Sequence, residues 1–197
     1  NVVYGEAGRE FDINPYSYAL NASRTLDPSE TYTRNYADFN IKNELNNNYI
    51  DYNLADITVQ GELKWKALKG LDIGLFASGN FQMASMEHNI TDYANQAMAY
   101  RAMPNATVRD NNSYLYTDPD VLYTLPITVL PYGGIYYRKD NKSVSYQYRL
   151  SANYTTTIKD SHILSNFTSA EITSIDRDQS WFRGWGRQYS MGDVAAY

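Results

Sequence analysis

The fold is decided by residues 57–67, which read Ile57-Thr58-Val59-Gln60-Gly61-Glu62-Leu63-Lys64-Trp65-Lys66-Ala67. Every odd position holds an apolar or small residue, and every even position holds a polar one. Unbroken alternation is typical of a β-strand with one apolar face and one polar face. Gly70 suits the left-handed position of a short turn, and residues 71–83 continue the alternation with Phe76 as its one exception. The sequence therefore predicts a long β-hairpin.

A second hairpin is predicted after residue 143. Residues 144–155 alternate in the same way, and a short turn is expected near Ile158-Lys159-Asp160. Alternation over residues 162–175 is too weak to assign the two faces of that strand. Residues 36–49 also read as extended, so we expect five strands.

Residues 84–143 separate the two hairpins and are predicted to form one long loop. Loops of this length are uncommon in compact domains and usually indicate either a function or a wrong assignment of the neighbouring elements. Thr91 is a candidate cap for a short helix that runs to Arg101, with Tyr93, Ala97 and Tyr100 at helical spacing. The rest of the loop is rich in proline and glycine, which favours an ordered but irregular path.

Outer-membrane β-barrels have long strands joined by short turns at one end and by long loops at the other. The predicted hairpins show the same asymmetry. Eleven residues span about 36 Å, enough to cross a hydrocarbon layer of ~30 Å with tilt. Turning Lys64 and Lys66 toward lipid would cost about 2–4 kcal/mol each near the midplane, so the odd positions are expected to face lipid. A soluble β-sandwich also alternates, and it stays open as the alternative.

Composition narrows the function further. The chain has 197 residues, a net charge of −5, no cysteine and 15% aromatic residues. So many aromatics argue against disorder, and an acidic chain without a basic run argues against nucleic-acid binding. The missing cysteines exclude a disulfide scaffold and a thiolate zinc site. No run approaches 18 apolar residues, so no transmembrane helix is expected.

Several segments together resemble the SusC/RagA family of TonB-dependent outer-membrane transporters. The matching segments run in the family's order: Asn14-Pro15-Tyr16-Ser17-Tyr18 with Arg24, Phe39-Asn40-Ile41-Lys42-Asn43-Glu44-Leu45, Gln60-Gly61-Glu62-Leu63-Lys64-Trp65, Ala94-Asn95-Gln96-Ala97-Met98-Ala99-Tyr100-Arg101, Leu130-Pro131-Tyr132-Gly133-Gly134, and Asn153-Tyr154 through Asp160-Ser161-His162. The resemblance implies a barrel importer of glycans or oligopeptides in the outer membrane. It also implies energy from the TonB complex and a SusD-like surface lipoprotein as partner.

The fold class expected is all-β, an antiparallel transmembrane β-barrel segment with long extracellular loops and one short loop helix. Asn1-Val2-Val3 is no signal peptide or initiator, so either a processed product or a piece of a longer protein is expected. The family's plug and TonB-contacting box do not lie in these residues, so the resemblance implies a piece of the barrel wall. Residues 1–197 would then form part of one barrel domain. Its segments are a loop (1–35), strands (36–83), the long outer loop (84–143), a hairpin (144–178) and a loop or next strand (179–197).

No catalytic motif is visible, so no enzyme activity, cofactor or metal is expected. His88 and His162 are the only histidines and have no carboxylate at ligand spacing. The candidates for substrate contact are loop aromatics that can stack on sugar rings or peptide side chains: Tyr114, Tyr116, Tyr132, Tyr136, Trp181 and Trp185. The alternative function is a soluble β-rich carbohydrate-binding module. The sequence does not name the substrate.

The predicted register makes one substitution pair informative. Leu63→Arg places a charge on the expected lipid face and should cost about 2–4 kcal/mol, which blocks assembly. Gln60→Arg places the same charge on the opposite face and should be tolerated. The measurement is the amount of folded protein recovered from outer membranes. Equal recovery of the two variants would contradict the register.

Overall fold

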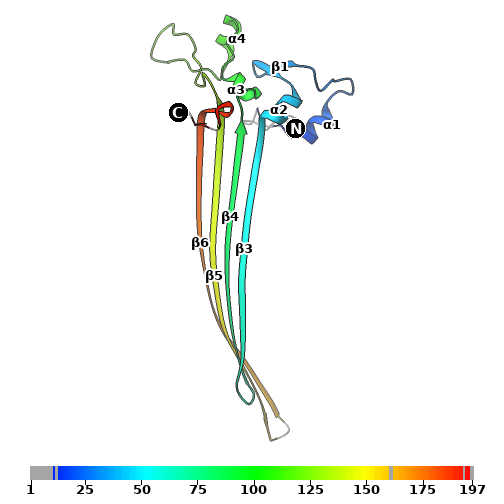
Figure 1. Ribbon diagram of the computed structural model, residues 1–197, viewed down its shortest axis with the longest axis vertical. Coiled ribbons are helices and arrows are strands. Elements are labelled where there is room, and N and C mark those ends of the chain that lie inside the picture. Colours follow the sequence, from blue (N-terminus) through cyan, green and yellow to red (C-terminus); the bar gives the residue numbers. More distant parts are fainter. Residues whose placement is uncertain (1–10, 12, 160–161, 193, 196–197) are drawn as a thin grey trace. The chain divides into compact units, whose positions relative to one another are not determined.

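The computed structural model describes residues 11, 13–159, 162–192 and 194–195. It is dominated by a five-stranded sheet in the order β3-β4-β5-β6-β7, whose long strands run side by side in Figure 1. The strands are β3 (Asn48–Leu68), β4 (Leu71–Ile90), β5 (Gly134–Ile158), β6 (His162–Gln188) and β7 (Val194–Ala195). The chain is mostly antiparallel β-sheet, which confirms the all-β prediction and both hairpins.

The sheet is open over the described residues. β3 pairs with β4 on one side only, and β7 pairs with β6 only through Arg187 and Gln188. No closed barrel is present in this part of the chain. Within the same residues, no helix is long and apolar enough to cross a lipid bilayer.

The strands are longer than alternation alone predicted. β4 continues to Ile90 and β5 begins at Gly134, so the long loop is residues 91–133 and not 84–143. β6 continues to Gln188, so residues 179–188 belong to the second strand of the predicted hairpin, and not to a loop or to the next strand. The predicted turn residue Asp160 lies outside the described residues, while Lys159 takes a positive φ of 52° beside it.

Short elements precede β3. They are α1 (Pro15–Asn21), the hairpin of β1 (Tyr32–Arg34) and β2 (Ala37–Phe39), and α2 (Ile41–Asn47). The prediction that residues 36–49 are extended is therefore wrong over α2. The helix begins there because the Asn40 side chain accepts a hydrogen bond from the Asn43 amide (3.1 Å), which caps a free N–H of the first turn.

The long loop contains two short helices where one was predicted, α3 (Asn95–Ala99) and α4 (Ala106–Asn111). Thr91 does not cap α3, because the helix begins after Ala94. The Thr91 hydroxyl instead donates a hydrogen bond to the Asn47 side chain, which ties the loop to the end of α2. A 3₁₀ turn, η1 (Tyr189–Met191), follows β6.

The chain divides into two compact units. The strand unit contains Tyr52–Met86 and Lys139–Trp181. The loop unit contains Asn1–Asp51, Glu87–Arg138 and Phe182–Tyr197. In the strand unit the β3–β4 turn lies beside the end of β5, since the Thr155 amide donates to the Gly70 carbonyl (2.7 Å).

Polar side chains of the strand unit meet across neighbouring strands on one face. Asn80 donates to Asp56 (2.5 Å) and to Thr58 (2.8 Å) between β4 and β3. Arg149 of β5 donates to Glu171 of β6 (2.7 Å). The polar face is thus formed by even positions of β3 and β4 and odd positions of β5 and β6. These contacts assign the faces of β6 that alternation left open.

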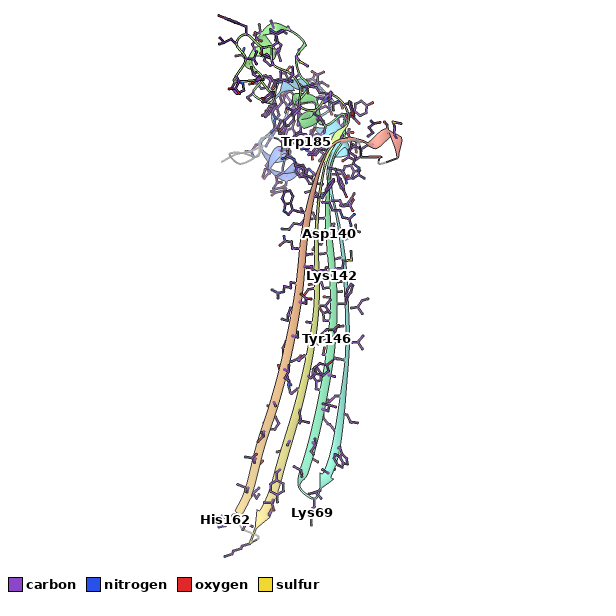
Figure 2. The ribbon with its side chains drawn as sticks, turned by 90° about the vertical axis from the view of Figure 1, so that its left-hand side faces the viewer. Lys69, Asp140, Lys142, Tyr146, His162 and Trp185 are labelled. Atoms are coloured by element: carbon purple, nitrogen blue, oxygen red, sulfur yellow. The ribbon has the colours of Figure 1, made fainter. Side chains whose placement is uncertain are left out.

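The opposite face carries the apolar positions. Tyr146 of β5 lies close to where a Gly79 side chain on β4 would stand (3.7 Å), so even β5 positions share a face with odd β4 positions. Figure 2 shows side chains projecting from both faces of the strands. Leu63 is 65% exposed and Tyr148 is 54% exposed, and no layer covers this face within the described residues.

Phe76, the one exception to the alternation, lies on the polar face. The Arg149 guanidinium lies over its ring, 5.6 Å from the centroid. A cation over an aromatic face is stabilising, by about 0.5–1 kcal/mol at exposed sites. The phenylalanine is therefore accommodated among polar side chains without a change of register.

Two glycines let β5 and β6 approach closely in the loop unit. Gly133 has a φ of +71°, and a side chain there would stand 2.4 Å from the Gly186 carbonyl carbon. Gly186 also has a positive φ of 73° inside β6. Past Gly186 the side chains change face, because Trp185 and Tyr137 both lie beneath Arg183 whereas Arg187 lies over Tyr136.

Gly133→Ala should destabilise the protein, because it adds left-handed strain of about 1–3 kcal/mol and a backbone clash. The control is Gly61→Ala in β3, where a side chain meets nothing within 4 Å. The measurement is the urea midpoint of the purified protein. We expect a lower midpoint for Gly133→Ala alone, and equal midpoints for the two variants would contradict the close approach.

Candidate functional site

The six aromatic residues predicted from the sequence do not form one site. Trp181 is exposed on β6 in the strand unit, whereas the other five belong to the loop unit. Tyr116 takes part in an isolated backbone bridge with Ile127. Tyr114 packs against the rings of Phe11 and Tyr100, which makes it part of the loop's own packing.

Tyr136 and Trp185 lie beneath arginine side chains. The Arg187 guanidinium is 3.8 Å from the centroid of the Tyr136 ring. Arg183 lies over both Trp185 (4.2 Å) and Tyr137 (4.9 Å). These rings are engaged within the protein, so packing explains both residues better than substrate stacking does.

A small apolar cluster holds the long loop against the strand ends. Its buried members are Ile90, Ala94, Ala97, Leu130 and Ile135. Tyr137 and Trp185, which pack against it, are at odd positions of β5 and β6, and odd positions of these strands lie on the polar face. The loop therefore covers the polar side of the strands in this unit. Thr128 strengthens the contact by donating to the Tyr100 carbonyl (2.7 Å).

Glu44 and Asn95 join the short N-terminal elements to the long loop. Glu44 is buried, and its carboxylate accepts hydrogen bonds from the Asn95 amide (2.8 Å) and the Asn48 side chain (2.8 Å). Burial raises the pKa of Glu44, and these hydrogen bonds and the charge of Arg34 partly offset the rise. The Asn95 side chain also donates to the carbonyls of Arg34 (2.9 Å) and Asp38 (3.1 Å).

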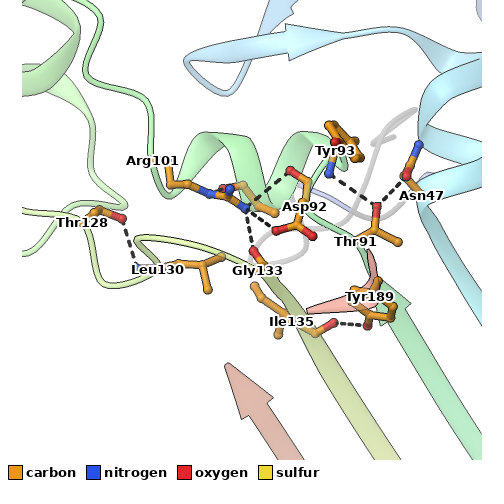
Figure 3. Close-up of polar contacts among 11 residues, drawn as sticks. Asn47, Thr91, Asp92, Tyr93, Arg101, Thr128, Leu130, Gly133, Ile135 and Tyr189 are labelled. Carbon is orange, nitrogen blue, oxygen red and sulfur yellow. Dashed lines mark hydrogen bonds and ion pairs between the residues drawn. The ribbon is translucent and has the colours of Figure 1, made fainter. Parts of the chain in front are cut away.

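A hollow of ≈ 680 Å³ opens where the loop meets the strand ends. Its wall combines the start and the end of the loop with residues after β6 and at the end of α2. The lining residues are Asn47, Thr91, Asp92, Tyr93, Arg101, Tyr132, Gly133, Gln188, Tyr189 and Ser190. Figure 3 shows the Arg101 guanidinium directed toward Asp92 and Gly133.

Arg101 is held in this wall by several backbone contacts. Its guanidinium donates to the carbonyls of Gly133 (2.6 Å), Ala97 (3.1 Å) and Asp92 (3.4 Å). The Asp92 carboxylate lies 3.8 Å away. Burial lowers the pKa of Arg101, and the charge of Asp92 acts in the opposite direction. Arg101 thus fixes the two ends of the loop to each other.

Of the predicted residues only Tyr132 lines this hollow. Sequence reasoning missed Asp92 and Gln188, and it used Tyr93 and Arg101 only as members of a helix. Arg101 lies two residues beyond α3. The sequence did offer one signal for this site: opposite charges at Asp92 and Arg101, on either side of a predicted short helix, can pair and bring the two ends of that helix together. His88 is not a ligand candidate, since its ring bonds to Asn48 (2.6 Å) and stacks on Tyr137.

No protein-family model matches the chain, and no curated protein matches it.

Asn95→Asp should loosen the β1–β2 hairpin, because a carboxylate cannot donate to the carbonyls of Arg34 and Asp38. Losing hydrogen bonds from buried groups costs about 1–3 kcal/mol. We expect about tenfold faster amide exchange or more over residues 32–39. Asn46→Asp is the control, since Asn46 is exposed on α2. Unchanged exchange in Asn95→Asp would contradict the role of Asn95.

Proposed function

We propose that this chain is part of the wall of an outer-membrane β-barrel that imports nutrients. The transport is energised by the TonB complex, the substrates are glycans or oligopeptides, and a SusD-like surface lipoprotein is the partner. The observation that carries the proposal is a band of exposed apolar side chains of limited height on the strand unit. On β3, β4 and β5 it lies on one face, with Phe76 as the exception, whereas Phe167 and Trp181 of β6 are exposed on the other face.

The band covers corresponding lengths of three strands. It runs from Ile57 to Ala67 on β3, from Leu71 to Met83 on β4 and from Tyr146 to Ile158 on β5. Twelve steps along a strand are about 40 Å, or about 28 Å of height at a tilt of 45°. Barrels in outer membranes carry an apolar band of roughly 25 Å.

Aromatic side chains stand at both margins of the band. Phe81 and Tyr146 mark the margin away from the turns, and Trp65 and Tyr154 mark the one near them. Lys142 follows on the same face and reaches over the Phe81 ring, 5.9 Å from its centroid. Aromatic girdles flanked by lysine are typical of a lipid–water boundary.

Beyond the band, farther from the turns, positions on the same face of β5 and β6 hold charged residues. On β5 the next positions are Lys142, Asp140 and Arg138, and on β6 they include Asp176 and Asp178. β6 has 27 residues, about 90 Å of strand, which is far more than a bilayer needs. We infer that the strands continue as a wall outside the lipid, where both faces meet water or protein.

An exposed apolar face of this size is unfavourable in water. Leaving a large apolar side chain exposed forgoes about 1.5–3 kcal/mol, and Leu63, Trp65, Tyr148 and Leu150 are all exposed on this face. Lipid covers such a face in a barrel, whereas a soluble binding module needs a second protein layer. The charges of Lys64 and Lys66 on the opposite face suit an aqueous lumen.

The tip of the long loop is the segment that best suits a partner protein. Residues 117–126 extend beyond the bridge between Tyr116 and Ile127, whose backbone groups exchange two hydrogen bonds of 2.8 Å. Leu122 is 86% exposed and Tyr123 is 98% exposed at this tip. Neighbouring exposed apolar side chains at a loop tip favour docking of another protein.

Replacing residues 117–126 with Asn-Gly should keep the bridge, because this dipeptide forms a two-residue hairpin turn. We expect normal amounts of barrel in outer membranes, with loss of the co-purified surface lipoprotein and of nutrient uptake. The control is Leu122→Ile, which keeps the apolar surface. A shortened protein that still binds its partner and transports normally would contradict the role of the tip.

A further inference from the structure

The hollow around Arg101 has the size and the location of a ligand site. Its volume of ≈ 680 Å³ lies within the range of about 300–1,000 Å³ that is usual for small-molecule sites. Its wall is built from segments distant in sequence, residues 91–93, 101, 132–133 and 188–190, all in the loop unit. The hydrogen bonds of Arg101 and Thr91 fix these segments, so the wall is formed before a ligand arrives.

The charges in the hollow are already satisfied. Arg101 is bound to three backbone carbonyls and faces the Asp92 carboxylate at 3.8 Å. Asp92 and Arg101 are the two charged residues among those that line the hollow. A ligand carboxylate would meet the negative charge of Asp92 and find the guanidinium occupied. A ligand ammonium would compete with Arg101 for the same carboxylate.

The remaining wall suits a neutral ligand with many hydroxyls. Tyr93 is 70% exposed and Tyr132 is 51% exposed, so two rings offer open faces beside the polar floor. Gln188 adds an amide and Ser190 a hydroxyl. Within the part of the chain that the structure describes, neither of these side chains has a hydrogen-bond partner. Aromatic faces beside donors and acceptors match the apolar faces and hydroxyls of a sugar ring.

We propose that this hollow binds an uncharged sugar unit of an oligosaccharide, and that the Asp92–Arg101 pair excludes carboxylated sugars. Tyr93 and Tyr132 stack on the sugar, and Gln188 and Ser190 bind its hydroxyls. The inference rests on the proposed import function in one respect, which is that the bound sugar is then transported. Binding of the sugar to the hollow can be measured without transport.

The test is binding of the full protein, purified in detergent, to an array of neutral and uronic-acid oligosaccharides. We expect binding to neutral members only. Tyr132→Ala and Tyr93→Ala should each weaken it about tenfold or more, whereas Tyr132→Phe should retain it because the ring remains. Tyr16→Ala is the matched control, since Tyr16 is an exposed tyrosine of α1 outside the hollow.

Asp92→Asn tests the charge selection directly. It leaves the three carbonyl contacts of Arg101 in place but removes the opposing carboxylate, so uronic-acid oligosaccharides should gain affinity at least severalfold. Three results would overturn the proposal: no neutral sugar bound, equal binding by Tyr132→Ala and wild type, or preference of the wild type for uronic acids or for an added mixture of oligopeptides. Failure of the import function appears separately, as protein that binds sugar in detergent but neither inserts nor transports in cells.

Discussion

Pairing of polar side chains across neighbouring strands is the constraint on which the structure depends. Asn80 with Asp56, and Arg149 with Glu171, fix polar side chains of four strands on one face. Because side chains alternate along a strand, the apolar alternate positions of β3, β4 and β5 then point to the opposite face, with Phe76 as the exception. A shift of one residue in β3 would break its pairs with Asn80 and place Lys64 and Lys66 among apolar side chains. The exposed apolar face is thus a consequence of the pairing.

The loop unit depends on a different kind of contact. Its buried apolar cluster is small, and polar contacts of Asn95 and Arg101 to backbone carbonyls supplement it. Each of these side chains satisfies several carbonyls that would otherwise need water. A loop fixed in this way can hold an open hollow, because its shape does not rely on filling the interior. The same arrangement leaves Tyr93 and Tyr132 exposed at the rim.

The regular part of the fold was predictable from the sequence, and the irregular part was not. The alternation over residues 57–83 located β3 and β4, since a two-faced strand needs nothing beyond its own residues. Strand ends were missed because they depend on tertiary contacts, such as the close approach of Gly133 to Gly186. The start of α2 is local, since the Asn40 side chain accepts a hydrogen bond from the Asn43 amide three residues later, and the interpretation of residues 36–49 as extended missed this signal. The faces of β6 required the partner of Glu171 on the neighbouring strand.

Prediction of the site was weaker for the same physical reason. Aromatic content marked Tyr132 but also Tyr136 and Trp185, whose rings lie beneath arginines. Arg187 covers Tyr136 from a distant part of the sequence, and Arg183 covers Trp185 from two residues away on β6. A sequence shows that a tyrosine is present, but its exposure depends on which cation or ring lies over it. Arg101 and Asp92 become informative only when the loop is closed and the distance between them is known.

The most direct measurement of the central claim is the accessibility of single spin labels along β3. The chain contains no cysteine, so a nitroxide can be attached to one introduced cysteine at a time over residues 57–67, in a full-length background without other cysteines. In outer membranes, labels at odd positions should collide mainly with oxygen dissolved in lipid, and labels at even positions with a water-soluble nickel complex. Equal exposure of both parities to the nickel complex would contradict the assignment of this face to lipid.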